Sequence, residues 1–196
     1  MKRFVIALSR EYGSGGFEVA QRLADHFGVE YYDKDLIRLA AEKRGISSEV
    51  VEAADETKAK PWEPPIPGGL TVFNDRLFDI QSQIIREKAS AESCIIIGRC
   101  GDKVLENNPE CISVFIFAEK EFKVKRIREA ADITTEEAEK LIKKVDKSRK
   151  AYYHYYTDGK WGQDSNYDIA LSTSKFGIDG VVNAVISIVN NFIEME

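Results

Sequence analysis

Residues 9–16 read SREYGSGG, a glycine-rich turn between the apolar run FVIAL at 4–8 and the amphipathic pattern GFEVAQRLADHF at 16–27. Glycines let successive backbone N–H groups converge on an anion, and the helix that follows adds the positive end of its dipole. A turn of this kind can also serve only to bring a strand and a helix close together. Its place directly after the first strand favours phosphate binding, by Gly13, Ser14, Gly15 and Gly16.

Apolar runs typical of buried strands alternate with helical patterns along the rest of the chain. The strands are predicted at 3–9, 30–33, 93–98, 111–118 and 167–173, and the helices at 16–27, 34–44, about 48–54, 72–91, 119–131, 135–152 and 178–193. This alternation predicts an α/β fold in which a five-stranded parallel sheet carries helices on both faces. Ligands bind such sheets beyond the carboxyl ends of the strands.

The composition is that of one soluble domain. The 196 residues are 43% hydrophobic and 31% charged, and the net charge of −5 argues against a nucleic-acid partner. No stretch comes close to the roughly 18–20 apolar residues of a membrane span, so no membrane partner is expected. The odd number of cysteines (Cys94, Cys100 and Cys111), without CxxC spacing, indicates reduced thiols in a cytoplasmic protein. His26 and His154 lie far apart, which argues against a histidine-based metal site, and no side chain is assigned to a metal.

Two segments depart from the average composition. Residues 119–150 hold eleven Lys/Arg against eight Asp/Glu, which indicates a solvated helical face laced with salt bridges unless an anionic ligand binds nearby. Residues 57–69 hold all but one of the five prolines, so this segment is expected to form a loop or a flap outside the core.

Polar residues follow the predicted strands where a ligand would bind. Asp33 ends the second strand, where an acid can contact a ligand or cap the next helix. Arg99 ends the third, where a guanidinium can grip a phosphate bidentately or pair with a carboxylate. Asp146 and Arg149 share one helix face, and their spacing alone favours a surface ion pair. The aromatic run at 152–156 is expected to form a packing seam rather than a base-stacking platform.

Together these motifs resemble the cytidylate kinase-like family, a branch of the P-loop nucleoside monophosphate kinases. The resemblance covers nearly the whole chain and is strongest in ALSREYGSGGFEVAQRLADHFGVEYYDKDLI at 7–37 and IIIGRCGDKVL at 95–105. It implies a P-loop NTPase-like three-layer sandwich with nucleoside monophosphate kinase topology. It also implies transfer of the γ-phosphoryl group of ATP, with Mg²⁺, to a CMP- or dCMP-like monophosphate or a related small phosphate ester.

The resemblance implies roles for particular residues as well. Asp33 and Arg38 would bind the acceptor nucleotide, Arg99 its phosphate, and Asp146 and Arg149 the sugar and phosphates. The arginines of the lid neutralise charge on the phosphoryl group, and the candidates are Arg126 and Arg128. The implied layout of the single domain at 1–196 is a core at 1–33, 88–118 and 166–196, an acceptor-binding flap at 34–87, and a lid at 119–165.

The glycine turn departs from the pattern of lysine-containing phosphate loops, GxxxxGK[ST]. Arg10 stands at the place of the first glycine and Gly16 at the place of the lysine, and Phe17 and Glu18 follow where a small residue and a hydroxyl are expected. We expect Arg10 to lie over the phosphates and to replace the lysine in part. The missing lysine leaves a second function open, a non-catalytic nucleotide-binding or sensing protein on a kinase scaffold.

Overall fold

The computed structural model of the chain describes residues 2–33, 45 and 70–194. Its centre is a five-stranded parallel sheet with the strand order β2-β3-β1-β4-β5. The strands are β1 (Val5–Arg10), β2 (Glu30–Tyr32), β3 (Cys94–Ile97), β4 (Cys111–Phe117) and β5 (Ile169–Ser172). The predicted five-stranded parallel sheet is confirmed.

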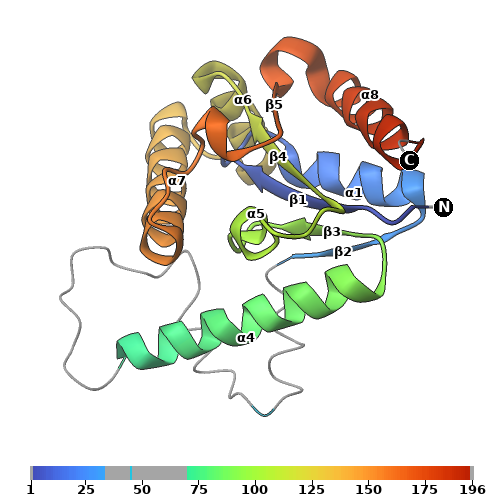
Figure 1. Cartoon of the computed structure of the whole chain (residues 1–196). Helices are drawn as coiled ribbons and strands as arrows, with labels where there is room; N and C mark the ends of the chain where they lie inside the picture. Colours follow the sequence, from blue (N-terminus) through green and yellow to red (C-terminus); the bar gives the residue numbers. More distant parts are fainter. Residues whose placement is uncertain (1, 34–44, 46–69, 195–196) are drawn as a thin grey trace.

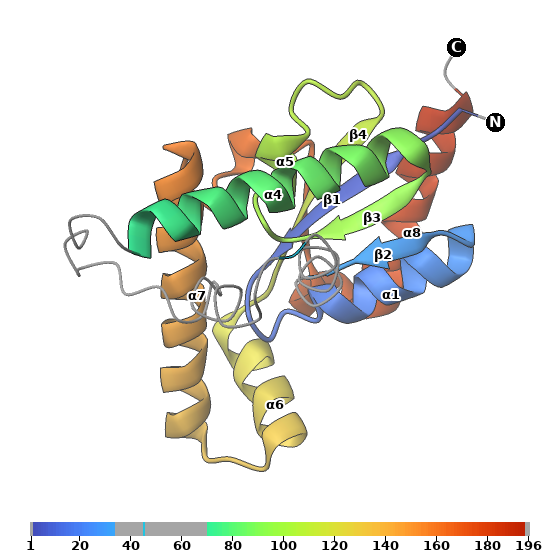
Figure 2. The same ribbon diagram turned by 90° about the horizontal axis from the view of Figure 1, so that it is seen from below.

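Helices cover both faces of this sheet. They are α1 (Gly16–Phe27), α4 (Leu70–Ala91), α5 (Gly101–Val104), α6 (Lys120–Ala131), α7 (Thr135–Thr157) and α8 (Thr173–Glu194), with a 3-10 turn η1 at Asp164–Asn166. Figure 1 shows α1 and α8 on one face and α4 on the other, and Figure 2 shows α6 and α7 extending beyond the sheet. The three-layer arrangement is as predicted, whereas α5 and η1 were not predicted. The helices expected at 34–44 and 48–54, and the proline-rich segment 57–69, lie outside the described residues.

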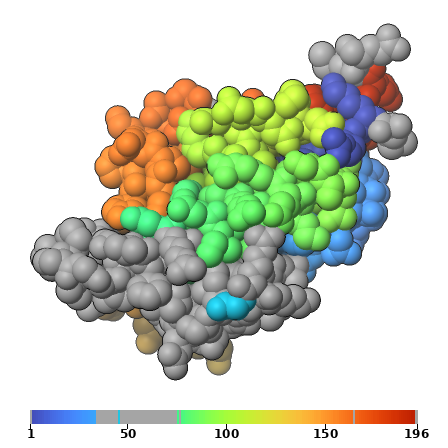
Figure 3. Space-filling view, turned by 60° about the horizontal axis from the view of Figure 1, so that its bottom comes forward, coloured from blue at the N-terminus to red at the C-terminus, as the bar shows by residue number. Residues whose placement is uncertain are grey.

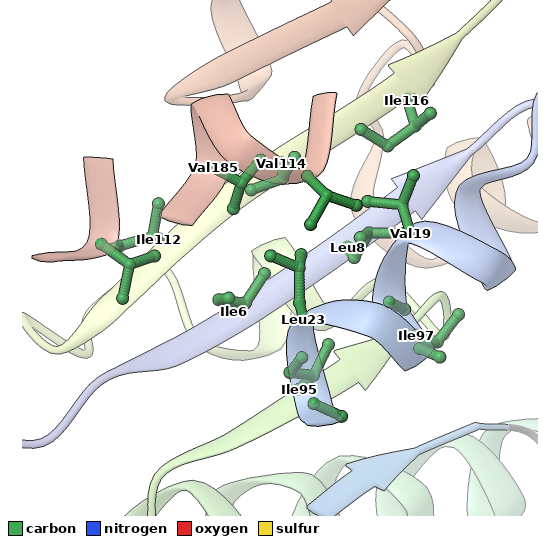
Figure 4. Packing of buried hydrophobic residues seen from close by; sticks show 14 of the residues in the cluster. Ile6, Leu8, Val19, Leu23, Ile95, Ile97, Ile112, Val114, Ile116 and Val185 are labelled. Atoms are coloured by element: carbon green, nitrogen blue, oxygen red, sulfur yellow. The ribbon is translucent and has the colours of Figure 1, made fainter. Parts of the chain in front are cut away.

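Two apolar cores hold the layers together. On the α1 and α8 side, Ile6 and Leu8 of β1 pack with Leu23 and Val185, as Figure 4 shows. On the α4 and α5 side the buried cluster consists of Val5, Ile85, Ala89, Cys94, Ile96 and Leu105. Because β1 is the central strand and both of its faces are buried, its sequence is a continuous apolar run rather than an alternating one.

The ends of α1 and α7 follow from their sequences. Gly15 (φ 81°) precedes α1 and Gly28 (φ 63°) follows it, both in the left-handed region that favours glycine, and the bounds of α1 are as predicted. At the start of α7, Thr134 and Glu137 form the predicted capping box. The helix continues to Thr157, beyond its predicted end, so the aromatic run lies within it.

Helix α4 lies across the outside of the sheet. In Figure 3 it crosses this face between the orange segment near the end of α7 and the blue N-terminal part. Its inner side buries Leu77, Ile84, Ile85 and Ala89, so the predicted apolar side is confirmed for Leu77, Ile84 and Ile85.

The last helix contains a break. Gly177 (φ 69°, ψ 170°) interrupts α8 after its first turn, so the long part begins at Ile178, as predicted. Among the described residues, α8 is the one helix long and apolar enough to cross a membrane, with a mean hydropathy of 1.5 over its most apolar window. This corrects the expectation that no stretch comes close to that limit. Its Val181 and Val185 are buried against the sheet and α1.

Candidate functional site

The glycine turn between β1 and α1 is held by contacts with neighbouring segments. Gly13 and Gly15 both have φ 81°, and a side chain at Gly15 would overlap Ile178. The buried Ser14 hydroxyl donates to the carbonyl of Glu11 at 2.8 Å, and the hydroxyl of Thr173, after β5, donates to the carbonyl of Ser14 at 2.6 Å. These contacts hold the loop in a turn at the positive end of α1, a backbone arrangement suited to an anion.

Arg10 occupies the space next to Gly16. A Cβ built on Gly16 would lie 2.5 Å from the Cβ of Arg10 and 3.0 Å from its Cγ. The stem of Arg10 therefore runs where a side chain at position 16 would begin. Phe17 points elsewhere, because its ring meets the ring of Tyr31 edge-on at 5.8 Å.

A pocket at the carboxyl ends of β1 and β3 brings three arginines together. Its lining consists of Ser9, Arg10, Gly98, Arg99, Cys100, Arg149, Tyr152, Tyr153 and Trp161. Arg10, Arg99 and Arg149 come from three segments far apart in the sequence, and all three were predicted as site residues. Arginine binds phosphate through paired N–H donors, so a pocket lined by three arginines favours an anion.

Arg99 sits on an unusual turn. Arg99 (φ 56°) and Cys100 (φ 53°) are consecutive non-glycine residues in the left-handed region, directly after β3. The arginine is 5% exposed, and its guanidinium lies 5.8 Å from the centre of the Tyr152 ring. Backbone strain of this kind concentrates at ligand sites, where the surrounding structure maintains it.

The inner face of α7 binds the glycine loop. Asp146 Oδ1 accepts a hydrogen bond from the backbone N–H of Tyr12 at 2.8 Å, and Arg149 donates to the carbonyl of Arg10 at 2.8 Å. The side chain of Asp146 is 13% exposed, so the surface ion pair that the spacing favoured is wrong. Burial raises the pKa of Asp146, and the Tyr12 N–H, Lys123 and Arg149 oppose this effect.

Glu11 and Lys123 belong to the same network, although neither was predicted. Lys123 of α6 is 2.8 Å from Glu11 Oε2 and 3.7 Å from Asp146 Oδ2, and Glu11 also accepts from the N–H of Ala118 at 3.2 Å. Glu11 stands in the quoted octapeptide, so its place beside the glycines was the available signal. Nothing in the sequence separates Lys123 from the other ten basic residues of the 119–150 segment.

The two arginines predicted on α6 differ in their surroundings. Arg126 lies against Gly15 and pairs with Glu18 of α1 at 2.9 Å, so its guanidinium is held beside the glycine loop. Arg128 is exposed, and the structure does not bring it to the loop.

Asp33 follows β2 and is half-buried, and it does not line the arginine pocket. Arg38 lies outside the described residues. Within the described ranges, no group of three or more His, Cys, Asp or Glu side chains could hold a metal ion. The three cysteines are free thiols, and burial raises the pKa of both Cys94 and Cys111 to about 12, which keeps these two thiols protonated and unreactive.

The salt bridges predicted for the basic segment and the packing predicted for the aromatic run are both present. The basic segment forms salt bridges along α6 and α7, such as Lys120–Glu139 at 2.9 Å and Lys140–Glu136 at 2.8 Å. The aromatic run packs against α4, where the rings of Phe78 and Tyr156 stack at 4.0 Å.

A glycine loop after the first strand, arginines beyond the strand ends and the order β2-β3-β1-β4-β5 place the chain in the class of P-loop kinases. It belongs to the cytidylate kinase-like family, whose sequence profile matches residues 5–175. It is 30% identical over 183 residues to a cytidylate kinase of Pyrococcus furiosus, covering 90% of this chain and 83% of the relative. It is 24% identical over 198 residues to a cytidylate kinase of Staphylothermus marinus, covering 97% and 98%.

Solved structures share the fold. An uncharacterized protein from Eubacterium ventriosum is 31% identical with a TM-score of 0.76, over 96% of this chain and 99% of that one. A gluconokinase from Sinorhizobium meliloti is 15% identical with a TM-score of 0.59, over 98% of this chain and 96% of that one. A shikimate kinase from Bacteroides thetaiotaomicron is 14% identical with a TM-score of 0.55, over 95% and 98%. At these identities the last two show the fold alone.

Proposed function

We propose that the protein is a nucleotide kinase that transfers the γ-phosphoryl group of ATP to a nucleoside monophosphate of the CMP or dCMP class. The observation that supports this most is the pocket in which Arg10, Arg99 and Arg149 meet beside the glycine loop. The chain belongs to the cytidylate kinase-like family, and similar proteins are named cytidylate kinases. A nucleotide is therefore the expected acceptor.

On the acceptor side, the chain supplies charge and position. Arg99 and Arg149 bind the phosphate of the monophosphate, and Asp33, Arg38 and Asp146 bind the rest of the acceptor. A phosphate oxygen of the acceptor attacks the γ-phosphorus, the bond from that phosphorus to the bridging oxygen breaks, and ADP leaves with the electron pair. The attacking oxygen is already anionic, so no general base is required.

On the donor side, the phosphates of ATP bind to the backbone of the glycine loop at Gly13, Ser14, Gly15 and Gly16. Arg10 takes the role of the absent lysine, and Arg126 adds a second cation from α6 beside Gly15. Mg²⁺ binds few protein ligands and several phosphate and water oxygens. It would enter the site with the phosphates of ATP and would neutralise part of their charge, and Glu11 is a carboxylate beside the loop that could hold it.

The experiment is a coupled assay of ADP release with Mg-ATP and a panel of acceptors that includes CMP, dCMP, UMP, AMP, shikimate and gluconate. We expect turnover with a cytidine monophosphate above the ATP hydrolysis measured without acceptor. Equilibrium binding of ATP is measured on the same preparation.

The alternative is a nucleotide sensor without catalysis, which the lysine-free loop favours. ATP binding without turnover of any acceptor would establish the sensor and overturn the kinase. Turnover of shikimate or gluconate alone would keep the phosphotransferase and overturn the nucleotide as its acceptor.

A further inference from the structure

A short, buried hydrogen bond joins the C-terminal part of α7 to the start of α5. The hydroxyl of Tyr153 donates to Oδ2 of Asp102 at 2.6 Å, and the two residues are 2% and 6% exposed. Burial raises the pKa of Asp102 against the opposing effects of the Tyr153 hydroxyl and the α5 backbone N–H groups. A hydrogen bond to a carboxylate in such surroundings is stronger than one between neutral groups.

Each end of this bond belongs to a segment that carries an arginine of the pocket. Asp102 follows Arg99 by three residues, across the left-handed pair Arg99 and Cys100. Tyr153 lies one helical turn after Arg149, on the same face of α7. The bond therefore connects the two backbone segments that present Arg99 and Arg149 to the pocket.

Neighbouring residues fix the position of the Tyr153 ring. A side chain on Gly159 would come within 2.9 Å of its Cε1, so the chain after α7 packs closely on the ring. The hydroxyl of Thr157 donates to the Tyr153 carbonyl at 2.6 Å and tightens the last turn of the helix. Strained turns such as Arg99–Cys100 persist where neighbouring contacts over-determine them.

We propose that Tyr153 and Asp102 are positioning residues, a strut that sets the distance between Arg99 and Arg149 and so the affinity of the pocket for a phosphate group. The strut acts through the two arginines and takes no part in phosphoryl transfer. The nature of the ligand, a nucleoside monophosphate, rests on the proposed function.

The test compares Tyr153→Phe, Asp102→Ala and the double variant with the wild-type chain. Tyr153→Phe keeps the ring and removes only the donor; Tyr153 itself lines the pocket, whereas Asp102 does not, so Asp102→Ala tests the bond away from the ligand. We expect each single variant to weaken binding of orthophosphate and of CMP about tenfold, the scale of one hydrogen bond to a charged group. The double variant should bind no more weakly than either single one, since both remove the same bond.

Two further variants make the readout specific. Asp102→Asn keeps an acceptor oxygen for the tyrosine and should bind orthophosphate within about threefold of wild type, well short of the loss expected when the bond is absent. Tyr155→Phe removes a hydroxyl from an exposed tyrosine of the same helix and should leave binding unchanged. In turnover, the acceptor KM should rise in Tyr153→Phe while the KM for ATP stays constant, a separation that general loosening of the fold would not produce.

The strut is overturned if Tyr153→Phe binds orthophosphate as wild type does. It is also overturned if Tyr153→Phe weakens binding and Asp102→Ala does not, since the hydroxyl would then contact the ligand itself. Failure of the proposed function would give a different result. The wild type would turn over no monophosphate, while orthophosphate binding would still be weaker in both single variants.

Discussion

The Cβ of Arg10 lies 2.5 Å from the position that a Cβ on Gly16 would occupy. The two positions lie at opposite ends of the glycine loop in sequence, yet they share one volume in space. A lysine at 16 and an arginine at 10 are therefore alternatives that exclude each other. The overlap involves the Cβ of residue 10, so a side chain at 16 requires a glycine at 10 in this backbone, and the two positions can be tested together.

Replacing Arg10 by alanine should impair the donor side of the site. We expect kcat/KM with Mg-ATP to fall roughly a hundredfold, the lower end of the effect of removing one preorganised electrostatic group. ATP affinity, measured by calorimetry, should fall as well. An Arg10→Ala protein that binds ATP as tightly as the wild type would show that Arg10 does not replace the lysine.

Restoring the lysine by itself should fail. In Gly16→Lys the new side chain meets Arg10, so we expect a lower Tm and no gain in turnover. In the double variant Arg10→Gly/Gly16→Lys the space is cleared, and turnover should exceed that of Arg10→Ala. If Gly16→Lys alone were stable and more active than the wild type, the steric relationship would have no functional meaning.

Arg126 and Arg128 form a matched pair on α6. Arg126→Ala removes a cation held beside Gly15 by Glu18, and we expect kcat/KM for ATP to fall about tenfold or more. Arg128 is exposed, so Arg128→Ala should match the wild type in the same coupled assay. Equal losses in both variants would contradict the placement of Arg126 as the donor-side residue.

Asp102 should make the stability of the protein depend on pH. Its folded pKa is raised above the ordinary value of 3.8, chiefly by burial. The folded chain binds this proton more tightly than the unfolded chain does, so the resulting stabilisation is complete below pH 3.8 and is lost as the pH rises through the folded pKa. Asp102→Asn lacks this titration.

The free energy of unfolding is measured from urea curves for both proteins. The value for Asp102→Asn minus the value for the wild type should be larger at pH 7 than at pH 4. Asp25→Asn, at an exposed position of α1, serves as the comparison. A difference between Asp102→Asn and the wild type that is constant with pH, or larger in acid, would contradict the raised pKa.

The backbone of the site could be predicted because local sequence determines it. Glycines 15, 16 and 28 set the ends of α1, and the alternation of apolar runs with helices set the parallel sheet. Parallel strands end at one edge, so the sequence could place Arg10 and Arg99 at the same edge of the sheet. Arg149 joined them by resemblance rather than by spacing.

The side-chain partners could not be predicted in the same way. Arg126 and Arg128 differ only by the rotation of α6 about its axis, and nothing local to either residue fixes that rotation. The bond between Tyr153 and Asp102 joins residues 51 positions apart, and the sequence pattern shows only two polar groups at unrelated places. The spacing of Asp146 and Arg149 suggested an ion pair between them. In the structure both side chains instead form hydrogen bonds with the backbone of the glycine loop.

Helix α7 contacts the glycine loop and α5 through Asp146, Arg149 and Tyr153, which lie between its middle and its C-terminal end. Mechanically, the α6–α7 hairpin is a cantilever with its support at this end and its tip at the turn before Thr135. A load applied at the tip produces its greatest bending moment at the support, next to Tyr12 and Arg10. A force on the tip of the hairpin would therefore be transmitted to the glycine loop.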